Sequence, residues 1–162
     1  MTPDEQLQQL ADRAAIADVV NRYATGLDTR DWVLYRSVFT AEFDNYTSNS
    51  ETPEHLRADD WVERWRPVFE GYDATQHLIS NHVFSISGDE ATCVSYLRAR
   101  HVILNDGVAD HYTIGGYYTN RFVRTDEGWK LCVRRLTVTW TEGDRGLTAV
   151  AEQLGRKRLG LS

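Results

Sequence analysis

The chain has few cysteines and prolines, no excess of positive charge and no long apolar run. Its two cysteines, Cys93 and Cys132, fall in strand-like stretches. A chain of 162 residues buries enough apolar surface without a disulfide, so we expect two reduced thiols. The formal net charge of -6 argues against a nucleic-acid partner, because binding phosphates requires clustered lysine and arginine. No basic segment followed by an apolar one opens the chain, and no run has membrane-spanning length. This predicts a cytoplasmic protein without a membrane partner.

Motifs for metal, phosphate or covalent chemistry are also missing. The chain has no His-x-x-x-His, Cys-x-x-Cys or Gly-x-Ser-x-Gly spacing. Gly115 and Gly116 lie inside a strand-like run, so they indicate a bulge or bend and not a phosphate-binding loop. A metal site made of His77, His101 and Asp28 would compete with proton transfer for the same side chains. We therefore expect no metal and no cofactor.

The first half of the chain has the apolar periodicity of helices. A pattern of three and four predicts a helix from Thr2 to about Gly26, and a second helix capped by Asp28 or Thr29 that continues to Phe39. A short strand is expected over residues 42–47. A third helix is expected from Ala58 to Glu70, where Gly71 ends it.

After Ala74 the periodicity changes to two, which is typical of strands. Glycine-containing turns separate four runs and predict antiparallel hairpins. The runs are 77–87, 91–104, 112–124 and 129–141. Helices followed by such strands predict one α+β domain over 1–162, with N-terminal helices packed on a strongly curved antiparallel sheet. Its core is expected over about 7–143, with a lid helix at about 146–159.

Five polar side chains lie within stretches that otherwise form core, and they are the candidates for catalysis: Tyr23, Asp28, Tyr46, His77 and His101. Alternation places His77 and His101 on one concave face and His82 on the opposite side. A histidine oriented by a carboxylate can act as a general base near neutral pH, and Asp28 is the candidate partner. The alternatives are core or surface imidazoles, amphipathic core tyrosines, and an Asp28 that only caps a helix.

Several segments together resemble a known family over about residues 10–140: the SnoaL-like branch of the nuclear-transport-factor-2-like superfamily. The branch includes scytalone dehydratase, hexachlorocyclohexane dehydrochlorinase and bile-acid 7α-dehydratase. The segments are Arg13-Ala14-Ala15-Ile16, Leu27-Asp28-Thr29-Arg30-Asp31-Trp32, Thr75-Gln76-His77, Leu97-Arg98-Ala99-Arg100-His101, Ile114 to Asn120 and Asp126 to Lys130. The resemblance implies a cone-shaped α+β barrel and elimination without a metal or cofactor.

The resemblance also implies roles for the candidates. His77 would be the base and Asp28 its partner, His101 a second histidine, and Tyr23 or Tyr46 a proton donor to oxygen. Tyr23 stands where the dehydrochlorinase has a lysine, and this disfavours dehydrochlorination. The predicted function is a cofactor-independent lyase, a dehydratase. The alternatives are an isomerase or polyketide cyclase at the same site, or a non-catalytic small-molecule-binding module.

An apolar pocket is expected to hold a hydrophobic, polycyclic hydroxy-ketone-like substrate. Its predicted wall is Val20, Trp61, Trp65, Phe69, Leu97, Tyr118 and Trp140. The outer face of an open sheet, here with Val94, Tyr96 and Val102, requires a partner. Because related enzymes are commonly trimers, we expect a homotrimer, with a dimer as the fallback.

Overall fold

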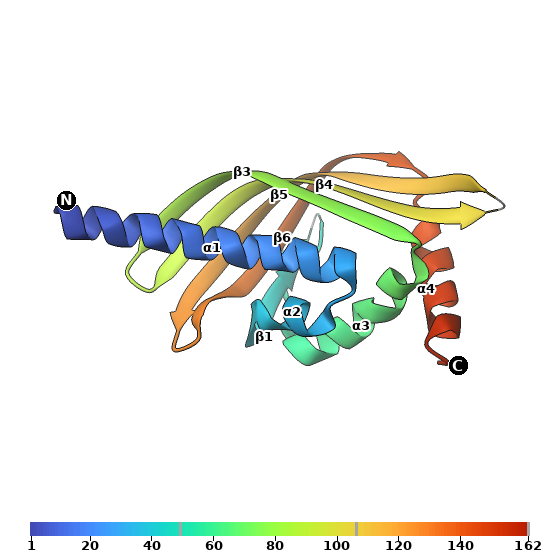
Figure 1. Ribbon diagram of the computed structural model, residues 1–162, viewed down its shortest axis with the longest axis horizontal. Helices are drawn as coiled ribbons and strands as arrows, with labels where there is room; N and C mark the ends of the chain where they lie inside the picture. The colour runs from blue at the N-terminus through green and yellow to red at the C-terminus, as the bar shows by residue number, and fades with distance from the viewer. Residues whose placement is uncertain (49, 106, 162) are drawn as a thin grey trace.

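The computed structural model describes residues 1–48, 50–105 and 107–161, and it places helices against one side of a curved sheet (Figure 1). The helices of the described residues are α1 (Pro3–Thr29), α2 (Trp32–Ser37), α3 (Ala58–Gly71) and α4 (Leu147–Arg158). The strands are β1 (Phe39–Tyr46), β2 (Glu54–Arg57), β3 (Ala74–Ser87), β4 (Glu90–Asn105), β5 (Val108–Thr125) and β6 (Gly128–Gly143). This confirms the predicted α+β class. Within the described ranges, no helix combines the length and apolar character that a membrane span requires.

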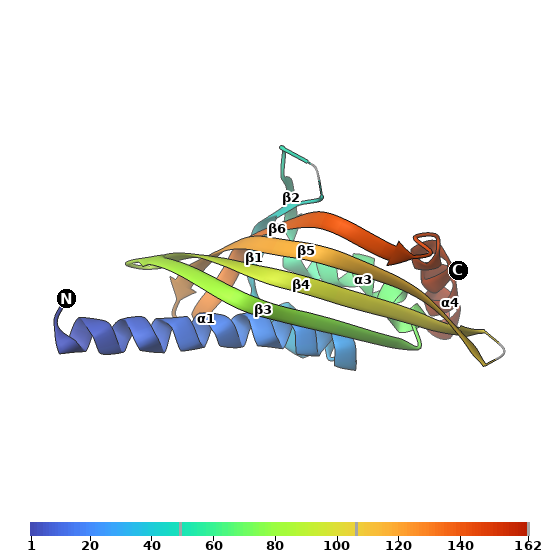
Figure 2. The same cartoon turned by 90° about the horizontal axis from the view of Figure 1, so that it is seen from above.

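The sheet is mixed and does not close. Its order is β2-β1-β6-β5-β4-β3, and β3 to β6 form the predicted antiparallel meander. The pairing of β1 with β6 is parallel, and β1 lies between β6 and the edge strand β2. Strand β2 was not predicted, since its four residues contain a single apolar side chain, Leu56. Figure 2 looks onto the convex face, which carries none of the described helices.

Helix α1 begins at a capping box, in which Thr2 accepts a hydrogen bond from the amide of Glu5 and the Glu5 carboxylate accepts one from the amide of Thr2. It packs along β3 and ends at Thr29, and the next residue, Arg30, adopts a left-handed conformation (φ 61°). The helix is therefore one turn longer than expected, and Asp28 lies within its last turn. Asp31 caps α2 by accepting from the amide of Leu34, so the capping role considered for Asp28 is wrong.

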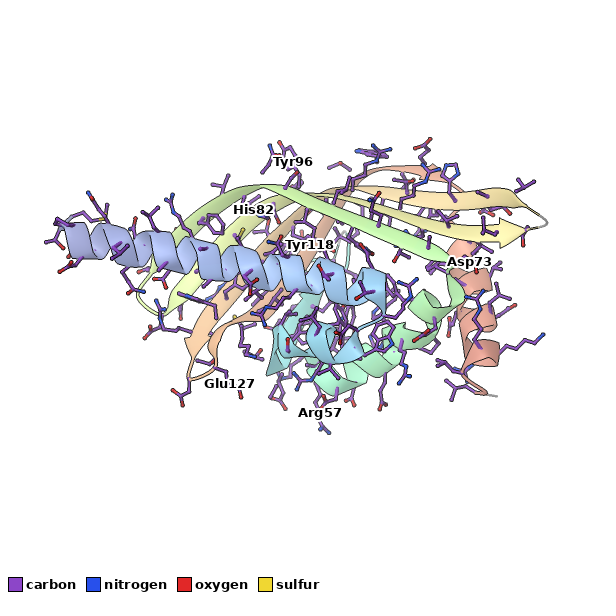
Figure 3. The ribbon with its side chains drawn as sticks, in the orientation of Figure 1. Arg57, Asp73, His82, Tyr96, Tyr118 and Glu127 are labelled. Carbon is purple, nitrogen blue, oxygen red and sulfur yellow. The ribbon has the colours of Figure 1, made fainter. Side chains whose placement is uncertain are left out.

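A bulge in β3 changes which side chains face the helices. The pairing with β4 shifts register between Ser80 and Val83, and Asn81 within it has φ 56°. The extra residue brings His82 to the same side as His77, where its ring lies 3.9 Å from the Cys93 sulfur (Figure 3). The predicted position of His82 on the opposite side is wrong for this reason.

The predicted C-terminal helix is present as α4, and it packs on α3 rather than over a cavity mouth. The two helices touch closely at Gly71, where a Cβ would lie 1.7 Å from the carbonyl oxygen of Ala151. Between α3, α4 and the sheet lies a small buried cluster that includes Tyr72, Ile103 and Leu147. Helix α4 therefore contributes to the buried core at this end of the sheet.

Candidate functional site

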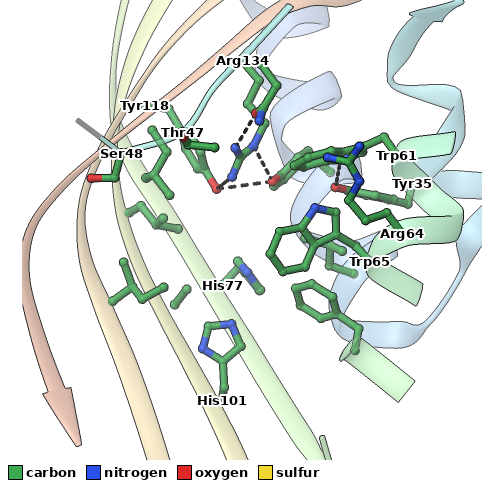
Figure 4. Close-up of a pocket in the computed structure, with 18 of the residues that line it drawn as sticks. Tyr35, Thr47, Ser48, Trp61, Arg64, Trp65, His77, His101, Tyr118 and Arg134 are labelled. Carbon is green, nitrogen blue, oxygen red and sulfur yellow. Dashed lines mark hydrogen bonds between the residues drawn. The ribbon is translucent and has the colours of Figure 1, made fainter. Parts of the chain in front are cut away.

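A cavity of about 270 Å³ lies between α1, α3 and the concave face of the sheet (Figure 4). Its wall is mostly apolar and aromatic, and it includes the predicted wall residues Trp61, Trp65, Phe69, Leu97 and Tyr118. The polar side chains of the lining include the ion pair of Glu54 and Arg64 and two further groups. His77 and His101 lie at one end, and Tyr23, Tyr118 and Arg134 lie at the other.

His77 and Asp28, which are 49 residues apart in the chain, form a hydrogen-bonded pair. His77 Nδ1 lies 2.7 Å from Asp28 Oδ1, and the backbone N–H of His77 donates to Asp28 Oδ2 at 2.7 Å. An ionised carboxylate can only accept hydrogen bonds, so Nδ1 carries the proton and Nε2 of the neutral ring keeps a lone pair. The His77 side chain is 5% exposed and lines the cavity.

The carboxylate of Asp28 is held by a further donor. Thr75 Oγ1 donates to Asp28 Oδ1 at 2.9 Å, and Arg30 in turn donates to Thr75 Oγ1 at 2.8 Å. Burial alone would raise the pKa of Asp28, but hydrogen bonds from His77 and Thr75 outweigh it and hold the pKa below its ordinary value. Asp28 is therefore ionised and can stabilise a positive charge on His77.

His101 sits beside His77, with ring centroids 5.6 Å apart. Its Nδ1 lies 3.1 Å from the carbonyl oxygen of Tyr112, and it must be the donor because a carbonyl only accepts. Burial, with the nearby charge of His77 as a smaller effect, lowers the pKa of His101 to about 4. At neutral pH His101 is thus an uncharged ring whose Nε2 can accept a hydrogen bond but does not carry a proton.

Arg134 organises the other end of the cavity. It donates to Tyr23 Oη at 3.0 Å, to Asn45 Oδ1 at 2.9 Å and to Tyr118 Oη at 3.4 Å. The two phenol oxygens lie 3.3 Å apart. Burial raises the pKa of Tyr118, so its hydroxyl stays protonated. This end of the cavity can donate hydrogen bonds to an oxygen atom on which negative charge develops.

Sequence reasoning missed Arg134 and Asn45, and alternation explains both omissions. In β6 the apolar residues Trp129, Leu131 and Val133 would place position 134 outside. The pairing with β5 shifts register between Arg121 and Phe122, and this bulge turns Arg134 inward.

In β1 the side chains of Phe43 and Asn45 face the core, whereas Tyr46 points away from the cavity. The ring of Tyr46 lies under the guanidinium of Arg135, at 3.6 Å from Cζ to the ring centroid. The predicted catalytic position of Tyr46 is therefore corrected, because its neighbour Asn45 occupies the cavity wall.

Two predicted wall residues also lie elsewhere. Val20, on the buried side of α1, belongs to the core and does not line the cavity. Trp140 is 46% exposed, and its indole packs over Gly115 in a hollow shared with Leu78 and Tyr96. Tyr96 is on the convex face, opposite to Tyr118 (Figure 3). Within the described residues, no group of three or more His, Cys, Asp or Glu is arranged to hold a metal ion.

Comparisons with known proteins agree with this architecture. The family description of the SnoaL-like domain matches residues 8–135. The chain is 27% identical over 154 residues to terrestric acid biosynthesis cluster protein E of Penicillium crustosum, covering 83% of this chain and 88% of that protein.

Solved structures show the same fold. The Kfla4162 protein of Kribbella flavida superimposes with a TM-score of 0.77 at 29% identity, covering 88% of this chain and 98% of that one. The hexachlorocyclohexane dehydrochlorinase LinA-type3 of Novosphingobium barchaimii superimposes with a TM-score of 0.69 at 20% identity, covering 87% and 95%.

Proposed function

The chain belongs to the SnoaL-like domain family, and from this premise we propose that it is a cofactor-independent lyase, a dehydratase, with His77 as its general base. The observation that carries the proposal is the 2.7 Å contact between His77 Nδ1 and Asp28 Oδ1. It leaves Nε2 as the ring nitrogen available to a ligand in the cavity that His77 lines.

In the proposed reaction His77 Nε2 removes a proton from a carbon next to a carbonyl group. The imidazolium that forms is stabilised by the ionised carboxylate of Asp28, which also keeps the ring in the required tautomer. The hydroxyl group on the neighbouring carbon then takes up the proton that His77 removed and leaves as water, which completes the elimination and returns His77 to its neutral form. A positioned base of this kind contributes about a hundredfold to ten-thousandfold in rate.

The donor end of the cavity supports the same chemistry. Tyr23, Tyr118 and Arg134 can donate to a substrate oxygen that carries negative charge or gains it as the proton leaves. His101, which is neutral, is suited to accept a hydrogen bond from a substrate hydroxyl and so to orient it. The role proposed for His101 is therefore positioning rather than proton transfer.

The wall of the cavity favours a flat, hydrophobic, cyclic substrate. Trp61, Trp65 and Phe69 form a chain of tilted and edge-on aromatic contacts along one side. The volume of about 270 Å³ is near the lower end of the range for small-molecule sites, which favours a ligand of one or two rings over a steroid.

An isomerase is the second candidate, because the donor end would stabilise an enolate equally well if no group left. Hydroxy-ketones and unsaturated ketones of one or two rings separate the two functions, since a dehydratase releases water from the first and an isomerase only moves the double bond of the second. Incubation in D₂O detects a proton removed from carbon in either case.

The test of the base is a His77→Asn variant, compared with His82→Asn on the same strand. Both histidines face the same side of β3, but His82 does not line the cavity. We expect H77N to lose about a hundredfold or more of kcat and H82N to keep wild-type turnover. A fully active H77N protein would remove the proposed mechanism.

We also propose that the protein forms a trimer through its convex face, with a dimer as the fallback. Exposed apolar side chains gather there, among them Leu78, Val83 and Tyr96. Analytical ultracentrifugation that shows only a monomer at micromolar concentration would contradict this.

A further inference from the structure

Arg134 is an enclosed cation without a counterion. Its partial exposure is to the cavity that it lines, and its three hydrogen bonds go to neutral oxygens of Tyr23, Asn45 and Tyr118. In the part of the chain that the structure describes, no carboxylate forms an ion pair with it. The faces of nearby aromatic rings offset some of the cost, with Trp61 at 5.4 Å from the guanidinium carbon. Enclosed charges in proteins are normally paired, but the guanidinium of Arg134 has no charged partner among the described residues.

Two further donors lie in the same cavity without partners. Asn45 is 1% exposed, and because its Oδ1 accepts from Arg134, the orientation of its amide is fixed and Nδ2 is left unbonded. The indole Nε1 of Trp65 also has no partner. In Figure 4 the ring of Trp65 borders the space between the histidines and the Arg134 end. Buried N–H groups in folded proteins are rarely left unbonded, so a ligand that accepts hydrogen bonds fits both.

The number of unused N–H and O–H groups at the Arg134 end of the cavity also favours a ligand that accepts hydrogen bonds. A guanidinium has five N–H groups, and the three bonds to Tyr23, Asn45 and Tyr118 leave two unused. The bond between the two phenols uses one of their hydrogens and leaves the other. The Arg134 end of the cavity therefore has one unpaired positive charge and a surplus of donors, because Glu54, the carboxylate in the described lining, is already paired with Arg64.

We propose that the substrate is an organic anion whose charge is shared between oxygen atoms, as in a carboxylate or an acidic enol. Its oxygens pair with Arg134 and accept hydrogen bonds from Asn45 and Trp65, and the ring system extends toward His77. The inference rests on the proposed function only in placing the reaction in this cavity. It names the class of substrate and can be tested by binding alone.

A second arginine in the same wall provides a matched control. Arg64 lines the cavity but donates two hydrogen bonds to Glu54, at 2.8 and 2.9 Å, so its charge is already balanced. Arg64→Gln and Arg134→Gln remove the same charge from the same cavity. Only the second removes a charge that lacks a partner.

The experiment is isothermal titration calorimetry at pH 7.5 with two pairs of probes. 2-Naphthoate and 2-naphthamide test the carboxylate, and dimedone and its methyl enol ether test the acidic enol. We expect the anion of at least one pair to bind the wild-type protein about tenfold to a hundredfold more tightly than its neutral analogue. R134Q abolishes this preference and R64Q retains it. Neutral probes that bind as tightly as both anions, or a preference that survives in R134Q, would overturn the inference.

A measurement on the wild-type protein does not depend on the folding of R134Q. The indole N–H signal of Trp65, assigned with Trp65→Phe, is expected to shift when the anion binds and to stay in place with the neutral probe. H77N separates this inference from the proposed reaction. If H77N keeps both turnover and the preference for anions, the reaction assigned to His77 fails while the substrate class stands. If the wild-type protein turns over hydroxy-ketones but binds anions no more tightly than neutral probes, the substrate class fails while the proposed reaction stands.

Discussion

We expect the substitution His101→Asn to reduce the loss of folding stability that occurs as the pH falls from 7 to 4.5. His101 is 6% exposed, and its Nδ1–H donates to the carbonyl oxygen of Tyr112. Burial lowers its pKa from an ordinary value of 6.5 to about 4. An Asn side chain is short enough to fit and keeps an N–H donor for Tyr112, but it cannot take up a proton.

The sign and size of the effect follow from these two pKa values. As the pH falls from 7, the unfolded chain protonates this histidine near pH 6.5, whereas the folded protein resists protonation until about pH 4. The unfolded state binds more protons within this window, so stability decreases as the pH falls through it. Between pH 7 and pH 4.5 the loss from His101 amounts to about 2 to 3 kcal/mol, at about 1.4 kcal/mol per unit of pKa difference.

The assay is urea unfolding of wild-type protein and H101N at pH 7 and pH 4.5, followed by circular dichroism. The cost of the smaller side chain is the same at both pH values and cancels in the comparison. Hydrogen bonds that His55 donates to Asp44 and Glu42 raise the pKa of this exposed histidine, and its effect on stability is the same in both proteins. Equal pH dependence in the two proteins would refute the reasoning. So would an NMR titration of His101 with a midpoint near 6.5.

Three further experiments, with four variants, test the site and its support. Asp28→Asn is expected to lower kcat by about a hundredfold to ten-thousandfold, because it removes the charge that stabilises protonated His77; unchanged kcat would show that the pair is only structural. Tyr46→Phe should keep wild-type turnover while Tyr23→Phe lowers it, and steady-state kinetics showing the reverse would restore Tyr46 to the site. Gly71→Ala should lower the free energy of unfolding by about 1 to 3 kcal/mol, because its methyl group would displace α4; an unchanged urea midpoint would contradict the close contact.

Local pattern was sufficient for the elements of the fold. Capping and apolar periodicity predicted α1 and α3, and alternation with glycine turns predicted the meander of β3 to β6. These features depend on neighbours within a few residues, so they can be read along the chain. The same reasoning, together with the family resemblance, placed His77 and Asp28 among the candidates, and the structure brings them into contact.

The sequence by itself determined the helices, the meander and most of the aromatic wall. The tertiary structure alone decided which polar side chains share the cavity. Bulges in β3 and β6 each add a residue to one strand, which reverses the facing of everything beyond them and turns His82 and Arg134 inward. The parallel pairing of β1 with β6 likewise selects Asn45 over Tyr46. Register between strands depends on contacts between residues far apart in the chain, so no local pattern could have shown that Arg134 would stand without a carboxylate partner.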